Sequence, residues 1–402
     1  MARISAPRFR VPHQPSGSAP GMIKTMEFLT AIYFVRSSAQ EIAARAAALA
    51  LEQSVEMPAA AIRSDYVRAQ ICGRVAAIEP LDATYFKVAL ELAVATTGFE
   101  TGQLMNMLCG NCSLQEDVQL VDVDLPATLR RSFPGPRYGM HGIRARLGVL
   151  DRALTCTALK PQGLSANELA ELCATFAHAG LDVIKDDHGL ADQAYAPFAA
   201  RVQACQRALR EVRRDTGRST LYAPSLSGHP RTLREQLRVA AGEGIEMLLA
   251  APMIMGLPVF QDLASDGFDM PVLAHPALSG VLRIAPPLFY GKLFRLFGAD
   301  AVIFPNFGGR FSFSREACQA LVAAARAPWD EIAPALPVPA GGMTVERVPE
   351  MIAAYGIDSM LLIGGGLLSA GAALLERSQQ FVAAVAEESA RASRRLTADD
   401  AQ

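Results

Sequence analysis

Residues 154–160 read Leu-Thr-Cys-Thr-Ala-Leu-Lys, and residues 181–187 read Leu-Asp-Val-Ile-Lys-Asp-Asp. Each is a short β-prone run that ends in charged residues, and the segment between them has helical character. The same unit occurs eight times from residue 154 onward. The apolar runs span residues 154–160, 181–187, 220–227, 247–256, 271–278, 301–309, 335–342 and 359–366.

The spacing of these runs predicts a parallel sheet. Their starts lie 24–39 residues apart, which leaves room for a strand, two loops and a crossover helix. Near-continuous apolar strands are typical of sheets covered on both faces, and eight βα units in about 250 residues match a (β/α)8 barrel. We therefore predict an α/β fold with a C-terminal TIM barrel. A doubly wound open sheet stays the alternative, because periodicity does not show closure.

The remaining segments predict a smaller domain in front of the barrel. Residues 25–148 lack the repeating unit and suggest an α+β domain, with strands at 28–34 and 75–78, a helix at 39–51 and turns at Asp82 and Gly110. We predict three parts, namely a flexible tail (1–24), this N-terminal domain (25–148) and the barrel domain (149–402). Within the barrel, Ser165 and Glu168 form a capping-box pattern for a helix over residues 166–177 that ends at Gly180. Residues 377–402 predict a surface helix with a frayed end.

Composition excludes several classes of protein. The 402 residues are 51% hydrophobic and 19% charged, so the chain can bury a large core and is not disordered. A formal net charge of -2 gives no attraction for nucleic acid or an acidic membrane, and the longest apolar stretch, residues 247–260, is too short to span a bilayer. The prolines of the Arg-containing tail disfavour an amphipathic transit peptide. Seven cysteines, an odd number, predict buried free thiols and a reducing, cytoplasmic location.

Active sites of (β/α)8 barrels lie at the C-terminal ends of the strands, and polar residues gather there in this sequence. Burying a lysine is costly unless it is paired or functional, and here two strands end in one, which favours function over accident. The polar residues and glycines at the strand ends are Lys160, Lys185, Asp186, Asp187, His188, Ser225, Ser227, His229, His275, Asn306, Arg310, Gly341, Gly342, Gly364, Gly365 and Gly366.

The end of the second strand is a candidate metal site. Lys185, Asp187 and His188 form a compact set, in which the carboxylate suits Mg2+ and the imidazole suits softer metals. Because strand side chains alternate, Asp186 should point out of the barrel if Lys185 and Asp187 point inward. The structural alternative is that Asp186, Asp187 and His188 cap the next helix while Lys185 forms an internal salt bridge.

Other strand ends suggest proton transfer and phosphate binding. Lys160 can act as a base if burial and a nearby metal lower its pKa. The pairs Gly341-Gly342 and Gly364-Gly365 follow the seventh and eighth strands, where barrels often bind phosphate through backbone N–H groups. His275 can be either functional or a satisfied core histidine.

These motifs resemble a known family. Residues 158–165, with Leu159-Lys160-Pro161, and residues 180–198 are similar to two segments of RuBisCO large subunits, the first motif and the metal-site strand. Residues 336–349 and 359–366 resemble the phosphate-binding strands of that family. The resemblance covers nearly the whole chain, and it implies a barrel with a smaller N-terminal domain that completes the site of a partner subunit.

The resemblance also implies roles for single residues. By position, Lys160 matches the enolising base, Lys185 the lysine that becomes a carbamate, Asp187 a metal ligand and His275 a strand-five histidine. The family site further includes two residues from the partner subunit, which match Glu52 and Asn111.

Several positions depart from the carboxylases. His188 stands at the position of a metal-ligand glutamate of the family. Arg310 falls near the position of the flexible-loop lysine. The other family residues are replaced at Gln162, Pro276, Ile303, Ala340 and residues 55–58. Because ribulose bisphosphate carboxylation needs two phosphate grips and the loop lysine, the chain resembles a RuBisCO-like protein and not a carboxylase.

The resemblance therefore implies a Mg2+-dependent enzyme that forms the enolate of a phosphorylated ketose or sugar acid, with isomerase or enolase chemistry. One alternative is a decarboxylase or transcarboxylase of a 3-oxo sugar-acid phosphate such as 3-oxo-isoapionate 4-phosphate, because loss of CO2 passes through the same enolate. Another is a non-catalytic protein that binds a phosphorylated metabolite. We expect a homodimer or a multiple of dimers.

Overall fold

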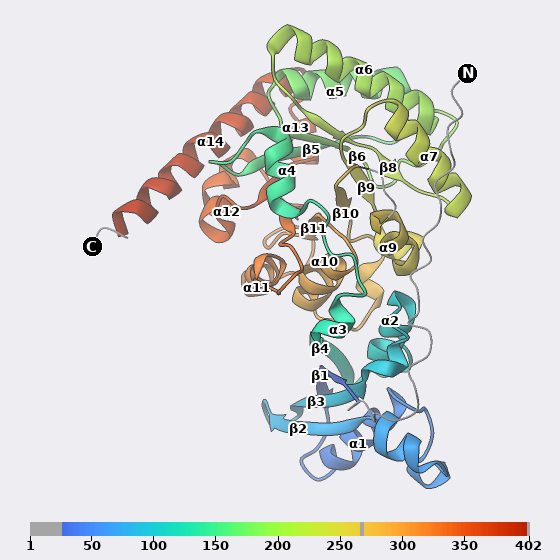
Figure 1. Ribbon diagram of the computed structural model, residues 1–402. Coiled ribbons are helices and arrows are strands. Elements are labelled where there is room, and N and C mark those ends of the chain that lie inside the picture. The colour runs from blue at the N-terminus through green and yellow to red at the C-terminus, as the bar shows by residue number, and fades with distance from the viewer. Residues whose placement is uncertain (1–25, 266–268, 400–402) are drawn as a thin grey trace.

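The computed structural model describes residues 26–265 and 269–399, so the predicted tail at residues 1–24 lies outside the described part of the chain. Two sheets organise these residues, with the smaller one set beneath the barrel in Figure 1. The small sheet is antiparallel, in the order β2-β3-β1-β4. Its strands are β1 (Phe28–Arg36), β2 (Arg74–Pro80), β3 (Tyr85–Ala93) and β4 (Val118–Asp124).

Alternating burial gives the small sheet one core face. Every second residue of β1, from Leu29 to Val35, is buried, as expected for a strand with one covered face. The helices α1 (Ile42–Glu52) and α2 (Thr101–Cys109) share its core, and the Tyr33 hydroxyl donates to the Leu108 carbonyl at 2.7 Å. The predictions of β1, β2 and α1 are confirmed within a few residues.

The large sheet is a closed parallel barrel, as predicted. Its strand order is β7-β6-β5-β13-β12-β11-β10-β9-β8. Only Pro224 separates β7 from β8, and since β7 pairs with β6 while β8 pairs with β9, the interrupted third strand closes the ring. The open doubly wound alternative is wrong. The strands are β5 (Leu154–Leu159), β6 (Val183–Asp186), β7 (Leu221–Ala223), β8 (Ser225–Leu226), β9 (Leu248–Ala250), β10 (Val272–Ala274), β11 (Ala301–Pro305), β12 (Leu336–Ala340) and β13 (Met360–Leu362).

Helices cover the outside of the barrel, and the long C-terminal helix α14 projects past it in Figure 1. This helix is more than a surface helix, because Phe381 and Val385 are buried in the core. The helices outside the small sheet are α3 (Ala127–Arg130), α4 (Gly139–Leu147), α5 (Ala166–His178), α6 (Phe198–Thr216), α7 (Pro230–Gly242), α8 (Pro252–Met255), α9 (Leu257–Ser265), α10 (Phe294–Leu296), α11 (Arg315–Arg326), α12 (Val348–Tyr355), α13 (Gly365–Leu368) and α14 (Leu374–Asp399).

The barrel interior is a packed apolar core and not a pore. Inward residues of the strands, such as Cys156, Val183 and Leu273, form one cluster, and Met140 and Ile143 of α4 belong to it. Helix α4 therefore closes the N-terminal end of the barrel. The opposite, C-terminal end is left for the site, as in other barrels.

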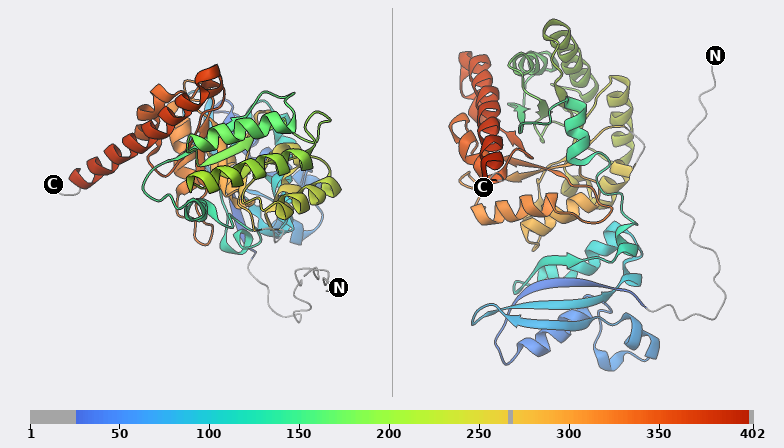
Figure 2. Two further views of the ribbon diagram at one scale, coloured as in Figure 1. Left: turned by 90° about the horizontal axis from the view of Figure 1, so that it is seen from above. Right: turned by 60° about the vertical axis from the view of Figure 1, so that its left-hand side comes forward.

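The small sheet is tied directly to the barrel. Leu120 of β4 exchanges backbone hydrogen bonds with the segment after β10, donating to the Arg283 carbonyl at 3.0 Å and accepting from the Ala285 amide at 2.8 Å. An ion pair of 2.5 Å joins Lys292 to Asp122. These contacts fix the arrangement seen from the side in Figure 2, where the sheet lies below one end of the barrel wall.

The cysteines and the helices were also subjects of the sequence predictions. All seven cysteines are free and buried. No helix of the described residues has the length and apolarity to cross a bilayer.

The capping box of α5 is formed as predicted, and its loss is expected to cost about 1 kcal/mol of unfolding free energy. Ser165 Oγ accepts from the Glu168 amide at 3.3 Å, and Glu168 Oε2 accepts from the Ser165 amide at 2.8 Å. We expect Ser165→Ala to lower the denaturation midpoint in urea. Thr175→Ala, on the same helix but outside the cap, should leave it unchanged or raise it slightly. Equal midpoints for Ser165→Ala and wild type would contradict a stabilising cap.

Candidate active site

The inward-facing side chains of β5 and β6 bring two lysines into one cavity. Lys160 follows inward Cys156 and Ala158 with the period of two that strands impose, and Lys185 follows inward Val183. Both amines line a cavity of about 840 Å3 at the C-terminal end of the barrel. Asp187, His188 and His275 line the same cavity, so the structure brings together these five predicted residues.

Lys185 is a buried amine without a carboxylate partner among the described residues. Its side chain is 4% exposed, and Nζ donates to the Asp186 carbonyl at 2.8 Å. Burial lowers the pKa of Lys185 to about 8. A substantial part of this amine is therefore neutral near pH 8, the form that can react as a nucleophile.

Asp186 points out of the barrel, as the alternation predicted. Its carboxylate pairs with Arg201 Nε at 3.0 Å, accepts from the Tyr222 hydroxyl at 2.7 Å and accepts from the Ser225 amide at 3.0 Å. Helix α6 begins at Phe198, far beyond these residues, and Lys185 donates to a carbonyl. The capping and salt-bridge alternative is therefore wrong.

Asp187, the first residue after β6, connects the loop after β6 to the loop after β5. Its Oδ2 forms an ion pair with Lys160 Nζ, and its Oδ1 accepts from the Gly189 amide at 2.9 Å. His188 Nδ1 lies 3.6 Å from Oδ1 of the same carboxylate. The carboxylate, the imidazole and the two amines thus surround one end of the cavity.

The two histidines of the cavity form a stacked pair. The rings of His188 and His275 lie 4.0 Å apart at an interplanar angle of 11°. Burial, reinforced by the charge of Lys185, lowers the pKa of His188 to about 4 and that of His275 to about 2. Both rings are neutral at pH 7. The Ala277 amide donates to His275 Nδ1 at 3.1 Å, so the proton of this ring is on Nε2.

Arg310 adds a third cation to the cavity lining. Burial lowers the pKa of Lys160, and the charge of Arg310 lowers it further. The Arg310 guanidinium lies 5.0 Å from the centroid of the Phe311 ring. With Lys160, Lys185 and Arg310 against the single carboxylate of Asp187, the lining favours an anionic ligand.

The predicted glycines also reach the cavity. Gly341, Gly342, Gly364 and Gly365 all line it. Gly364 and Gly365 have no atom within 4 Å of the place where a Cβ would stand. Among the described residues, no turn or loop hydrogen bond is donated by the N–H groups of Gly342, Gly364 and Gly365. They are therefore available to an anion.

Sequence reasoning missed the apolar wall of the cavity. Leu278 and Phe311 are 57% and 47% exposed although both line the cavity. Leu278 adopts a φ of 66°, which is uncommon for a residue with a Cβ and is typical of functional loops. Tyr290 and Phe313 extend the same wall, with ring centroids 6.4 Å apart. No periodic pattern marks such loop positions.

Besides Asp186, four polar residues of the strand ends do not line the cavity, namely Ser225, Ser227, His229 and Asn306. Ser227 donates its amide to Gln236, and His229 contacts Thr232 at the start of α7. Asn306 is buried and accepts from the Tyr355 hydroxyl at 2.6 Å. These residues hold loops rather than line the site.

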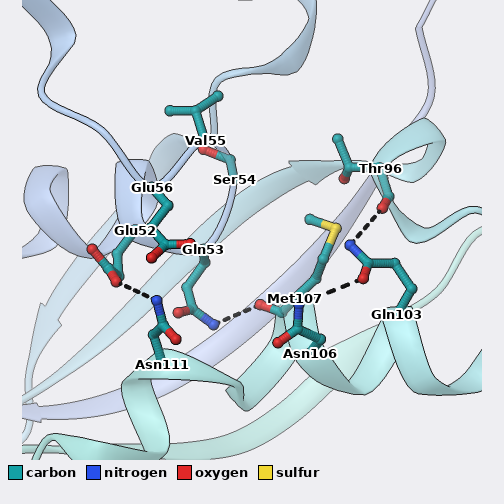
Figure 3. Close-up of a pocket in the computed structure, with 10 residues that line it drawn as sticks. All are labelled: Glu52, Gln53, Ser54, Val55, Glu56, Thr96, Gln103, Asn106, Met107 and Asn111. Carbon is teal, nitrogen blue, oxygen red and sulfur yellow. Dashed lines mark hydrogen bonds between the residues drawn. The ribbon is translucent and has the colours of Figure 1, made fainter.

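Glu52 and Asn111 form a second, separate site in the N-terminal part of the chain. Asn111 Nδ2 donates to Glu52 Oε1 at 2.9 Å, and both line a cavity of about 210 Å3 (Figure 3). Gln53 donates to the Met107 carbonyl at the side of this cavity, as Figure 3 shows. No residue lines both cavities. Within one chain, these two predicted residues are therefore apart from the barrel site.

The barrel cavity lacks a complete set of ready metal ligands. Over residues 26–265 and 269–399, no three His, Cys, Asp or Glu side chains gather where they could hold a metal ion. Asp187 and His188 supply an oxygen and a neutral imidazole. A carbamate on the neighbouring Lys185 would supply the further anionic oxygen that Mg2+ prefers, so the residues fit such an ion once Lys185 is modified.

Comparisons with known proteins agree with this geometry. The model of the "Ribulose bisphosphate carboxylase large chain, catalytic domain" family matches residues 139–277. The chain is 54% identical to a 5-methylthioribulose-1-phosphate isomerase of Rhodospirillum rubrum, over 90% of this chain and 97% of that protein. It is 35% identical to a 2,3-diketo-5-methylthiopentyl-1-phosphate enolase of Geobacillus thermodenitrificans, over 78% of this chain and 81% of that protein. A crystal structure of a RuBisCO-like protein from Rhodopseudomonas palustris superposes with a TM-score of 0.85 at 47% identity, covering 90% of this chain and 99% of that one.

Proposed function

Since the chain belongs to the RuBisCO-like proteins, we propose that its substrate is a ketose phosphate that carries a methylthio group. It is an isomerase or enolase of phosphorylated sugars and not a ribulose bisphosphate carboxylase. Identity to the Rhodospirillum isomerase is 54%, against 35% to the Geobacillus enolase. We therefore propose isomerisation of 5-methylthioribulose-1-phosphate, or of a close analogue, as the reaction.

The observation that carries this proposal is that the cavity lining combines cationic groups with exposed apolar side chains. The Arg310 guanidinium and the backbone of the glycine loops suit a phosphate, and the Lys160 amine suits the polar part of a ketose. Leu278 and Phe311 suit a thioether, which has little to offer to hydrogen-bond donors.

We propose Mg2+ as the cofactor, held by Asp187, His188 and a carbamate on Lys185. The lowered pKa of Lys185 supports the carbamate, because CO2 reacts with the neutral amine. When bound, the ion would stabilise the negative charge that develops on the enediolate oxygens. The imidazole of His188 is neutral because its pKa is far below 7, so a ring nitrogen can bind the metal ion through its lone pair.

Lys160 is the proposed base. Its lowered pKa increases the share of neutral amine at neutral pH, and this amine can take the proton from the carbon next to the carbonyl. Delivery of a proton to the neighbouring carbon completes an isomerisation, whereas delivery of a solvent-derived proton to the original carbon produces exchange with solvent. His275 would donate from Nε2 to an oxygen of the enediolate, since its Nδ1 already accepts from Ala277. Gly341, Gly342, Gly364 and Gly365 would hold the phosphate with their backbone.

We propose that Glu52 and Asn111 complete the barrel site of a partner subunit in a homodimer, or in a multiple of dimers. Their separation from the barrel cavity within one chain supports this, because they can reach a cavity of this kind only in another copy. The isologous symmetry of a homodimer would then build two equal sites. We also propose a cytoplasmic location, which the seven buried free cysteines support.

Mixing two inactive variants is expected to restore activity. In a heterodimer of Lys160→Ala and Asn111→Ala subunits, one site carries both defects and the other carries neither. Random exchange makes about half of the dimers heterodimers with one intact site each, so the mixture should recover about a quarter of wild-type activity. Activity is measured after unfolding and refolding the two variants together. Recovery should be absent when either variant is refolded alone, and no recovery in the mixture would contradict the shared site.

The reaction is tested with a panel of ketose phosphates and 3-oxo sugar-acid phosphates in Mg2+, bicarbonate and deuterated water. Isomerisation of 5-methylthioribulose-1-phosphate with deuterium incorporation and no release of CO2 is the expected result. The panel also contains 2,3-diketo-5-methylthiopentyl-1-phosphate. Conversion of this compound alone would make the chain an enolase like the Geobacillus relative. Release of CO2 would indicate the decarboxylase alternative, and turnover of nothing in the panel would overturn the proposal.

A further inference from the structure

The loop after β11, residues 306–313, carries Arg310 to the cavity and is fastened at its base. We call it the Arg310 loop. The Asn306 amide donates to the Ala340 carbonyl at the end of β12 at 2.8 Å. Asn306 Oδ1 accepts from the Tyr355 hydroxyl of α12. The loop therefore leaves the barrel with a fixed starting direction.

The Arg310 loop next touches the loop after β12 backbone to backbone. A Cβ on Gly342 would lie 2.4 Å from the Gly309 Cα, and a Cβ on Gly309 would lie 2.8 Å from the Gly341 carbonyl oxygen. Both distances are too short for real atoms, so only glycines allow this approach. The residue next to Gly309 is Arg310, so the contact lies directly beside the side chain that enters the cavity.

Arg347 bridges the same two loops with one side chain. It belongs to the short 3-10 helix η7 (Val345–Arg347). Its Nη1 donates to the Gly342 carbonyl at 2.8 Å, and its Nη2 donates to the Phe307 carbonyl at 3.1 Å. The planar guanidinium suits this double contact, whereas the ammonium of a lysine has no such fork.

An acidic residue and a ring hold Arg347 in place. Its Nε donates to Glu350 at 2.9 Å, and the other oxygen of Glu350 pairs with Arg315 at 2.5 Å. The guanidinium groups of Arg315 and Arg347 lie 4.2 Å and 5.4 Å from the centroid of the Phe307 ring. Phe307 of the Arg310 loop therefore forms one cluster with Arg315, Arg347 and Glu350.

We propose that Arg347 is a positioning residue, which fixes the Arg310 loop to the loop of Gly341 and Gly342 so that Arg310 stands in the cavity before the substrate arrives. A loop that is already ordered does not lose this conformational freedom on binding, and the gain appears as tighter binding and faster turnover. Arg347 itself lines neither the barrel cavity nor the cavity of Glu52 and Asn111. The inference rests on the proposed function for its kinetic part only.

The kinetic test is a double-mutant cycle between Arg347 and Arg310. Arg347→Met should lower kcat/KM for the isomerisation roughly tenfold or more, because it frees the loop. Arg347→Lys should lie between this variant and wild type. In the Arg310→Met background, Arg347→Met should change kcat/KM less than about twofold, because the side chain that it positions is gone. The same fold loss in both backgrounds would overturn the positioning role and leave a general structural one.

A second readout does not depend on the reaction. In the substrate-free protein, Arg347→Met should speed amide hydrogen exchange across residues 307–313, and it should weaken the binding of inorganic phosphate measured by calorimetry. Arg377→Met is the matched control, because Arg377 pairs with Glu346 on the same 3-10 helix without touching the loop. Unchanged exchange in Arg347→Met overturns the inference whichever substrate is found. Faster exchange without turnover of the proposed substrate would instead count against the proposed function alone.

Discussion

Lys160→Ala is expected to lower the rate of α-proton exchange about 10^2- to 10^4-fold, the usual contribution of a positioned general base. Lys160 is the amine beside Asp187 in the cavity, and burial with the charge of Arg310 lowers its pKa toward the range where a base is effective. The loss should appear in kcat far more than in KM, because the amine acts on the reacting carbon. Deuterium incorporation followed by NMR measures it directly.

A surface lysine provides the control for this variant. Lys87 pairs with Glu79 on the outside of the small sheet, so Lys87→Ala should keep the wild-type rate. Circular dichroism and the thermal midpoint of Lys160→Ala should match those of wild type, since the side chain is partly exposed. If Lys160→Ala kept more than about a tenth of the exchange rate, the assignment of the base would be wrong.

Arg201→Met is expected to lower the unfolding free energy by about 3–5 kcal/mol, the usual cost of removing one member of a buried ion pair. The side chains of Arg201 and Asp186 are both 0% exposed. Without Arg201, the Asp186 carboxylate would stay buried with only neutral donors around it. Arg201 also donates to the carbonyls of Ala191 and Ala196, so its loss frees the loop behind the site.

Two comparisons isolate the buried charge as the cause. Arg214→Met lies on the same helix in an exposed pair with Asp215 and should change the unfolding free energy by less than about 0.5 kcal/mol. The double variant Arg201→Met with Asp186→Asn should be more stable than Arg201→Met alone, because no charge is left unpaired. Chemical denaturation measures all three. A loss for Arg201→Met no larger than that for Arg214→Met would contradict this account.

The barrel and the polar end of its cavity could be predicted because both follow from periodicity. A period of two places Lys185 and Asp187 on one side of β6 and Asp186 on the other, and the contact with Arg201 confirms that division. The strand runs are short and almost continuously apolar, because both faces of a parallel sheet are covered. Local patterns of this kind need no knowledge of distant parts of the chain.

The contacts between loops could not be predicted in the same way. The stacking of His188 on His275 depends on how the loops after β6 and β10 leave the barrel, and no repeat in the sequence encodes that direction. The same holds for Leu278 in the apolar wall and for the bridge from Arg347. Strand β3 was not predicted, although its buried and less buried residues alternate regularly along the chain.

Helix α4 sets a limit on how the protein can be divided. Its residues Met140 and Ile143 are part of the barrel core, although they lie before the first barrel strand and next to the N-terminal domain. A fragment that began at residue 149 would lack Met140 and Ile143, so the N-terminal end of its barrel core would be exposed to water. Any truncation meant to isolate the barrel should therefore start before Gly139, the residue at which the family match also begins. Such a fragment would keep Met140 and Ile143, although one that began after Phe133 would lose the contact of Phe133 with Phe297.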